Sequence, residues 1–165
     1  MNLEKYQQYS RIARGLEKAD LVLKNARIVN VFTEEIIRGD IAIQDGIIAG
    51  IGSFHGKEER DLAGRYVCPG FIDSHLHLES TLVTPAELVT VASRHGTTTF
   101  IVDPHESANV SGLAGIDYIL DQTEDVKANV YVMMPSCVPA TAIDDNGCTL
   151  TAEDMAPYLH NSRIL

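Results

Sequence analysis

The stretch Pro69-Gly70-Phe71-Ile72-Asp73-Ser74-His75-Leu76-His77 decides the fold and function predicted for this chain. Residues 66–73 are largely apolar and end in polar residues, which is typical of a buried strand in a parallel sheet. Side chains two positions apart in a strand point to the same side, so His75 and His77 are expected to project together past its carboxyl end. Ligand sites of parallel α/β folds form at that end.

Two imidazoles aimed at one point make half of a ligand shell for a divalent metal such as zinc, manganese or iron. The alternative is that His75 and His77 are surface histidines that alternate by chance. The polar run that begins at Asp73, directly after the apolar residues, argues against chance. The pattern therefore predicts His75 and His77 as metal ligands.

A second polar cluster, Asp103-Pro104-His105-Glu106, follows the next apolar stretch at 97–103. Adjacent strands of a sheet lie ~5 Å apart, so these side chains are expected to approach the histidine pair. Carboxylates near a metal-activated water act as acid or base, or hold a polar substrate, which makes Asp103 and Glu106 candidate catalytic residues. Alternatively, both carboxylates cap the helix that follows.

The chain after residue 66 alternates between strand and helix patterns. For one helix, Thr84 is a suitable N-cap, Pro85 a suitable first residue and Gly96 a suitable C-terminal cap. This alternation predicts parallel strands joined by crossovers. The predicted elements are strands at 66–73, 97–103 and 129–135, helices at 84–95, 112–123 and 151–160, and the start of a further strand at 163–165.

The chain before residue 66 has a different pattern. Residues 2–19 have the pattern of a polar helix, whereas residues 20–32 are rich in β-branched side chains and predict two short strands that turn near Asn25. Residues 39–52 predict two further strands, with Asp45-Gly46 as a two-residue hairpin turn. Residues 20–65 are therefore expected to form a small antiparallel β unit.

Composition and charge restrict the functions to consider. The 165 residues suffice for one ordinary domain, and 45% hydrophobic with 22% charged residues indicate a globular chain. The formal charge of −10 argues against nucleic-acid binding but leaves an uncharged nucleobase as a substrate. No apolar run approaches the roughly 20 residues that span a bilayer, and the N-terminus lacks a signal-peptide pattern. We therefore expect a cytoplasmic protein without membrane contact.

A short β unit followed by Pro69-Gly70-Phe71-Ile72-Asp73-x-His75-x-His77 resembles the amidohydrolase superfamily. Three further segments resemble its adenine deaminase group: His77-Leu78-Glu79-Ser80, Asp103-Pro104-His105-Glu106 and Ser136-Cys137-Val138-Pro139. The resemblance implies an α/β chain with an N-terminal helix at 1–19, a portion of a small β-sandwich at 20–65, and a truncated (β/α)8 barrel at 66–165.

The reaction that this resemblance implies is hydrolytic deamination of adenine to hypoxanthine and ammonia, a step of purine salvage. His75 and His77 would bind one ion of a two-metal centre of manganese, iron or zinc, and a bridging hydroxide would attack C6 of the purine. Glu106 would contact the purine ring, and Asp103 would take part in catalysis. The ligand is then a small purine base, and the full-length enzyme could be a homo-oligomer.

The remaining metal ligands of such an enzyme are expected after residue 165. We therefore expect the isolated chain to be inactive and poorly stable, because its last strand would lack a neighbour. Two alternatives stay open. One is another amidohydrolase, such as a cyclic amidase or an acetyl-sugar deacetylase, and the other is a non-catalytic half-barrel module that pairs with another chain.

Overall fold

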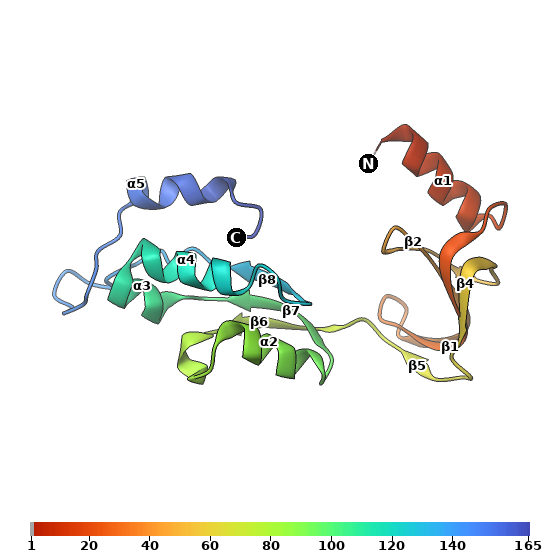
Figure 1. Ribbon diagram of the computed structural model, residues 1–165, viewed down its shortest axis with the longest axis horizontal. Coiled ribbons are helices and arrows are strands. Elements are labelled where there is room, and N and C mark those ends of the chain that lie inside the picture. Colours follow the sequence, from red (N-terminus) through yellow and green to blue (C-terminus); the bar gives the residue numbers. More distant parts are fainter. Residues whose placement is uncertain (1) are drawn as a thin grey trace. The chain divides into compact units, whose positions relative to one another are not determined.

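The computed structural model describes residues 2–165 and divides the chain into two compact units (Figure 1). Unit 1 ends at Pro69, and unit 2 runs from Gly70 to Leu165. Both units contain helices and strands, which confirms the mixed α/β class expected from the sequence. None of the helices within the described residues has the length and apolar character needed to cross a membrane.

Unit 1 is a five-stranded sheet with one helix. Its elements are α1 (Leu3–Ala13), β1 (Ala19–Asn30), β2 (Glu35–Gln44), β3 (Ile47–Gly52), β4 (Gly56–Asp61) and β5 (Tyr66–Val67). The strand order is β3-β2-β1-β4, with β5 also paired to β1. The β1–β2 and β2–β3 pairs are antiparallel, but β4 and β5 pair parallel to β1, so the expectation of a purely antiparallel unit is wrong. The sequence did not predict β4 because its exposed Lys-Glu-Glu-Arg-Asp run lacks any apolar alternation.

Two turn signals in unit 1 have different outcomes. Asp45-Gly46 connects β2 to β3 with φ angles of 49° and 75°, as a type I′ hairpin turn requires. Asn25 does not turn the chain, because β1 continues through it as a β-bulge in which the register with β2 shifts between Leu23 and Ala26. Its φ of 55° is one that asparagine tolerates. The two strands predicted at 20–32 are therefore one strand.

The N-terminal helix is shorter than the predicted residues 2–19. Asn2 caps its start by accepting a hydrogen bond from the Lys5 backbone N–H at 2.9 Å. Gly15 follows its end with a φ of 71°, the left-handed conformation that commonly stops a helix. Ile12 is fully buried and packs the helix onto the core of the sheet in unit 1.

The buried carboxylate of Asp40, in β2, connects β1 with the loop between β3 and β4. The Asp40 side chain accepts hydrogen bonds from the Lys24 ammonium and from the backbone N–H groups of Asn25 and Phe54. Burial by itself would raise the pKa of the Asp40 carboxyl, but these donors outweigh burial and hold that pKa below its usual value of 3.8. The stability that this carboxylate contributes is therefore complete above a pH of about 4 and is lost as the pH falls through the folded-state pKa.

Replacement of Asp40 by alanine is expected to destabilise unit 1 by about 3 kcal/mol, because the partly buried ammonium of Lys24 loses its ion pair and two backbone N–H groups lose their acceptor. Hydrogen exchange of peptides from β1 and β2 near neutral pH measures this change. The Lys57→Ala control removes an exposed ion pair with Asp20 and should leave exchange nearly unchanged. Equal exchange rates in the Asp40 variant and the control would contradict the assigned role of the buried carboxylate.

Unit 2 alternates strands with helices. Its elements are β6 (Phe71–Leu76), the 3-10 helix η1 (Glu79–Thr81), α2 (Pro85–Ser93), β7 (Thr97–Val102), α3 (His105–Ser111), α4 (Leu113–Gln122), β8 (Asn129–Val132), α5 (Ala152–Met155) and the 3-10 helix η2 (Ala156–His160). The sheet order is β6-β7-β8, and both strand pairs are parallel. The predicted succession of parallel strands and helices is confirmed.

The strand predicted at 66–73 is in fact two strands. β5 ends at Val67 and pairs with β1, whereas β6 begins at Phe71 and pairs with β7. The side chains of Phe71 and Ile72 are 62% and 64% exposed, so the expected burial of this stretch is wrong. The reason is that β6 is an edge strand of the three-stranded sheet in unit 2.

Other boundaries in unit 2 also differ from the prediction. The sequence pattern indicated the short helix α3 only through the alternative that Asp103 and Glu106 cap a following helix, because a seven-residue helix directly after a strand leaves little periodicity to detect. The strand predicted at 129–135 ends at Val132. The further strand expected at 163–165 is a single parallel bridge between Ile164 and Val132.

The core of unit 2 lies between the sheet and its helices. Phe100 and Val102 of β7 point into it together with Val130 and Val132 of β8, and α2 and α4 contact each other over this face. Leu76 of β6 packs against the same core. Because neighbouring residues of a strand point to opposite faces, the residue before Leu76 lies on the other face of the sheet.

Candidate metal centre

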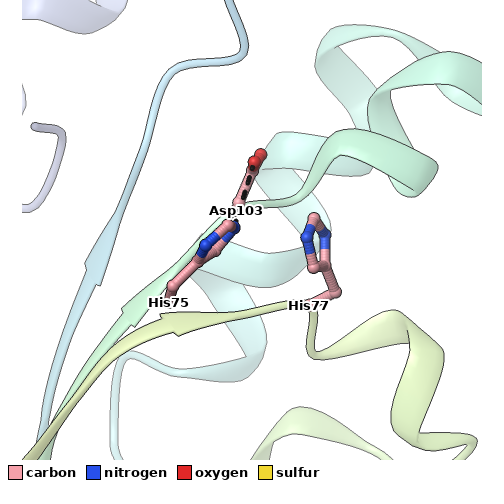
Figure 2. Close-up of side chains that lie close together, drawn as sticks. All are labelled: His75, His77 and Asp103. Atoms are coloured by element: carbon pink, nitrogen blue, oxygen red, sulfur yellow. Dashed lines mark ion pairs between the residues drawn. The ribbon is translucent and has the colours of Figure 1, made fainter.

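His75 and His77 lie at the carboxyl end of β6. Leu76, between them, packs against the core of unit 2, and Leu78 is buried within it. The two histidines alternate with these leucines, so their side chains point away from the core. The ring centres are 5.1 Å apart and the ring planes are inclined by 49° (Figure 2). The two imidazoles thus lie side by side, as the alternation predicted.

Asp103 lies beside this histidine pair at the end of β7. Its backbone N–H donates to the carbonyl of Leu76 at 2.9 Å, which aligns the ends of β6 and β7. Its carboxylate Oδ2 is 3.8 Å from Nε2 of His75 (Figure 2). One ligand atom from each of His75, His77 and Asp103 lies within 4.8 Å of the other two, a spacing at which one cation could contact all three.

The donor atoms of this group suit a divalent metal. Imidazole nitrogen and carboxylate oxygen are ligands of zinc, manganese and iron in proteins. Oδ1 of Asp103 is buried and has no hydrogen-bond partner within residues 2–165, so this carboxylate has unused acceptor capacity. The His75 side chain is 64% exposed and remains accessible to a ligand. The residues present therefore fit such an ion.

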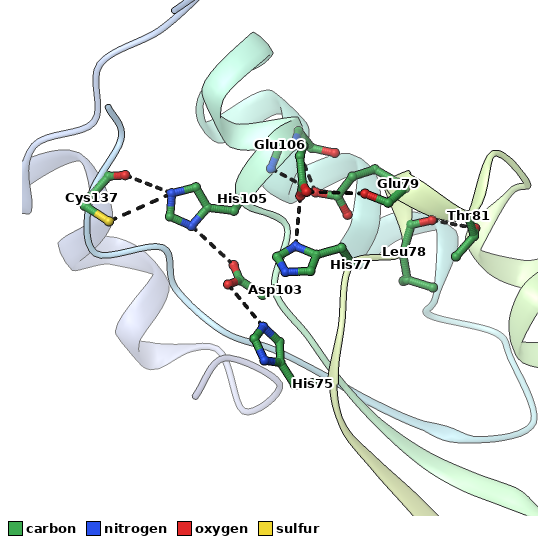
Figure 3. A network of polar contacts seen from close by, with 11 residues as sticks. His75, His77, Leu78, Glu79, Thr81, Asp103, His105, Glu106 and Cys137 are labelled. Carbon is green, nitrogen blue, oxygen red and sulfur yellow. Dashed lines mark hydrogen bonds and ion pairs between the residues drawn. The ribbon is translucent and has the colours of Figure 1, made fainter. Parts of the chain in front are cut away.

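Glu106 fixes the orientation of His77. Nδ1 of His77 lies 2.9 Å from the Glu106 carboxylate Oε2 (Figure 3). An ionised carboxylate only accepts, so Nδ1 is the donor and carries the proton. The lone pair of the neutral ring is then on Nε2, the form in which a histidine can bind a metal through that atom. Ser80 Oγ donates a longer bond of 3.3 Å to the other oxygen of Glu106.

Glu79 and Glu106 form a pair of neighbouring carboxyl groups next to His77. Burial raises the pKa of the Glu79 carboxyl, and the charge of Glu106 adds to this rise although backbone N–H donors oppose it. Burial also acts to raise the pKa of Glu106, but its hydrogen bonds and the nearby imidazole outweigh burial and lower it. The shifts are opposite because two carboxylates this close disfavour joint ionisation. Together with His77 they make a second group with metal-ligand spacing, again within 4.8 Å.

The structure also joins His105 to Cys137, a contact that the sequence did not predict. Nε2 of His105 donates to the Cys137 carbonyl at 2.9 Å and lies 3.9 Å from its Sγ, while Nδ1 is 3.7 Å from Oδ1 of Asp103 (Figure 3). His105 follows β7 and Cys137 follows β8, so both lie at carboxyl ends of neighbouring parallel strands. Their position at the same edge of the sheet is the sequence feature from which this contact could have been predicted.

A hollow of about 450 Å³ borders part of this site. Its lining includes Glu79, Ser80, Glu106 and Tyr118, and its volume is in the range of small-molecule sites. A larger hollow of about 750 Å³ between α2 and α4 contains none of the candidate residues. The smaller hollow is therefore the one that adjoins the candidate site.

Comparison with known proteins adds independent information. Residues 66–162, more than half of the chain, match the amidohydrolase family. The adenine deaminase of Desulfitobacterium hafniense (strain Y51) is 57% identical over 165 residues, which is 100% of this chain and 29% of that protein. The adenine deaminase of Geobacillus kaustophilus (strain HTA426) is 51% identical over 148 residues, 90% of this chain and 26% of that protein. The adenine deaminase of Listeria monocytogenes (serotype 4b, strain F2365) is 48% identical, with 99% and 28% covered. The chain thus spans less than a third of the length of these relatives.

Proposed function

The chain belongs to the amidohydrolase family, and we propose that it is part of an enzyme that hydrolyses adenine to hypoxanthine and ammonia. The observation that carries the proposal is the group His75, His77 and Asp103, gathered at the ends of two adjacent parallel strands. The names of the relatives favour adenine over the cyclic amides or acetyl sugars that other amidohydrolases would hydrolyse.

His75 and His77 would hold a divalent metal in this enzyme. When bound, such an ion acidifies water and supplies a hydroxide nucleophile near neutral pH. A centre of two ions, of manganese, iron or zinc, needs more ligands than these two imidazoles. We propose that other parts of the complete protein provide them, which agrees with the share of its relatives that this chain spans.

The carboxylates of Asp103 and Glu106 have separate roles in this proposal. Glu106 is ionised at neutral pH, since its pKa is lowered by its hydrogen bonds and by His77, and an ionised carboxylate accepts hydrogen bonds from the N–H groups of a purine. Asp103 faces His75 through Oδ2, and its Oδ1 is buried without a hydrogen bond, so this carboxylate has the acceptor capacity to take the proton from the attacking water. That proton would leave with the amino group as ammonia.

We further propose that β6, β7 and β8 are the first strands of a (β/α)8 barrel and that unit 1 is part of a β-sandwich. Three observations support this architecture: the strands are parallel and in sequence order, helices separate them, and Ile164 begins to pair with β8 as a next strand would. A cytoplasmic location, a purine base as ligand and self-association of the complete enzyme remain predictions of the sequence.

A chimera tests the proposed function directly. In it, this chain replaces the 165 matching residues of the Desulfitobacterium hafniense relative. The chimera is expected to release ammonia from adenine and to form hypoxanthine, measured by chromatography and an ammonia assay. The isolated chain should release none, because its metal centre would be incomplete.

Two results would contradict the proposal. A soluble, metal-containing chimera that leaves adenine intact but opens a cyclic amide or deacetylates an acetyl sugar would favour another amidohydrolase. A chimera without any of these activities, combined with an isolated chain that forms a stoichiometric oligomer by mass measurement, would favour a non-catalytic half-barrel module. The unmodified relative serves as the positive control.

A further inference from the structure

Helix α3 begins without a cap from its own sequence. Its N-cap residue is Pro104, whose side chain makes no capping hydrogen bond. The first backbone N–H groups of a helix have no partner inside it and need acceptors from elsewhere. Glu79, from η1, supplies that acceptor: its Oε1 receives the N–H groups of Glu106 and Ser107, both at 3.1 Å (Figure 3).

The capped residue is also the one that contacts the histidine. Glu106 gives its backbone N–H to Glu79 and its carboxylate to Nδ1 of His77, at 2.9 Å. Movement of the Glu106 backbone would therefore move the carboxylate away from the ring. The contacts form a continuous path from Glu79 through Glu106 to His77.

A carboxylate is a costly choice for a helix cap at this place. Serine, threonine or asparagine can cap a helix without charge, whereas Glu79 puts a carboxylate close to that of Glu106. Oε2 of Glu79 is moreover buried and has no hydrogen-bond partner among the described residues, which is unfavourable for a carboxyl oxygen. Such a costly arrangement is typical of functional sites rather than of simple helix caps.

We propose that Glu79 is a positioning residue that holds the Glu106 carboxylate against His77. The proposal deepens the proposed function and rests on it, because the importance of Glu106 is part of that function. Glu79 itself need not touch the purine or the metal. Its effect passes through the backbone of Glu106.

The test compares Glu79→Ala with Glu79→Gln in the chimera. Alanine removes both hydrogen bonds and is expected to lower kcat for adenine by about 100-fold, since a misplacement of roughly 1 Å has an effect of that size. Glutamine keeps a carbonyl oxygen for the two N–H groups and should restore most of kcat. If Glu79→Ala is insoluble, Glu79→Asp takes its place, because it keeps the charge but shortens the reach, and it should lower kcat in the same direction.

A double-variant comparison separates positioning from general stability. In a chimera that already carries Glu106→Gln, the change Glu79→Ala should have little further effect on kcat, because the carboxylate it positions is gone. A structural cap would lower kcat by the same factor in both backgrounds. Asp154→Ala, which removes the carboxylate that caps α5 together with Thr151, is the matched control and should leave kcat unchanged.

Zinc affinity gives a readout that does not depend on adenine. Partners that orient a metal-binding histidine contribute about 10- to 100-fold to metal affinity, so Glu79→Ala should weaken zinc binding within that range and Glu79→Gln should not. A chimera that binds zinc but leaves adenine intact would refute the proposed reaction while still testing Glu79. Zinc affinity and kcat both unchanged in Glu79→Ala, or equal losses with and without Glu106→Gln, would overturn the positioning role.

Discussion

Replacement of both His75 and His77 by alanine in the chimera is expected to abolish metal binding at this site and to lower kcat for adenine by at least about 10³-fold. The reason is that, in the proposed function, two imidazoles from one strand end would supply the first half of the ligand shell, and no other pair of histidines within residues 2–165 belongs to a group with metal-ligand spacing. Without the metal, water near neutral pH is a poor nucleophile. Metal content by elemental analysis and kcat for ammonia release measure the two effects.

The matched control replaces His55 and His95 by alanine instead. Both side chains are exposed, and neither belongs to the candidate groups with metal-ligand spacing. This control should keep its metal and its activity. If the His75 and His77 double variant also kept its metal, the metal centre would have to lie elsewhere, and the role proposed for β6 would be wrong.

The position of the histidine pair can be predicted from the sequence because it depends on local geometry. A strand places residues two apart on one side, and parallel strands end at one edge, so the pattern alone brings His75, His77 and Asp103 together. The same reasoning places Glu106 near the pair. These contacts need only the correct strand order, and the alternation of strand and helix determines that order.

The contacts that the sequence did not reveal depend on how separate elements pack. Glu79 reaches the start of α3, and His105 reaches the loop after β8, through contacts that link residues 27 to 32 positions apart. Helix α3 carries His105 and the N–H groups that Glu79 accepts, and it is too short to give a clear periodic pattern in the sequence. In unit 1, the charged strand β4 escapes prediction for a similar reason, since its pairing with β1 determines its conformation more than its composition does.

Replacement of Glu106 by glutamine in the chimera is expected to lower kcat for adenine by about 10²- to 10³-fold, the usual contribution of one preorganised hydrogen-bonding group beside the reacting atoms. Glutamine has nearly the same shape but cannot hold a negative charge toward His77 or toward the N–H groups of a purine. The metal should remain bound when it is supplied in excess, because His75 and His77 are intact and the glutamine carbonyl still accepts from Nδ1 of His77. Steady-state kinetics with elemental analysis of the same protein separates loss of chemistry from loss of metal.

Glu153→Gln is the control for this change, since it makes the same substitution at an exposed position of α5. It should behave as the unsubstituted chimera. The contrast with the histidine variants then assigns the roles: loss of activity together with metal identifies a ligand, and loss of activity with metal retained identifies a residue that acts on the substrate or the water. If Glu106→Gln lost its metal as completely as the histidine double variant does, Glu106 would be part of the metal centre, and the group of His77, Glu79 and Glu106 would be the site that holds the ion.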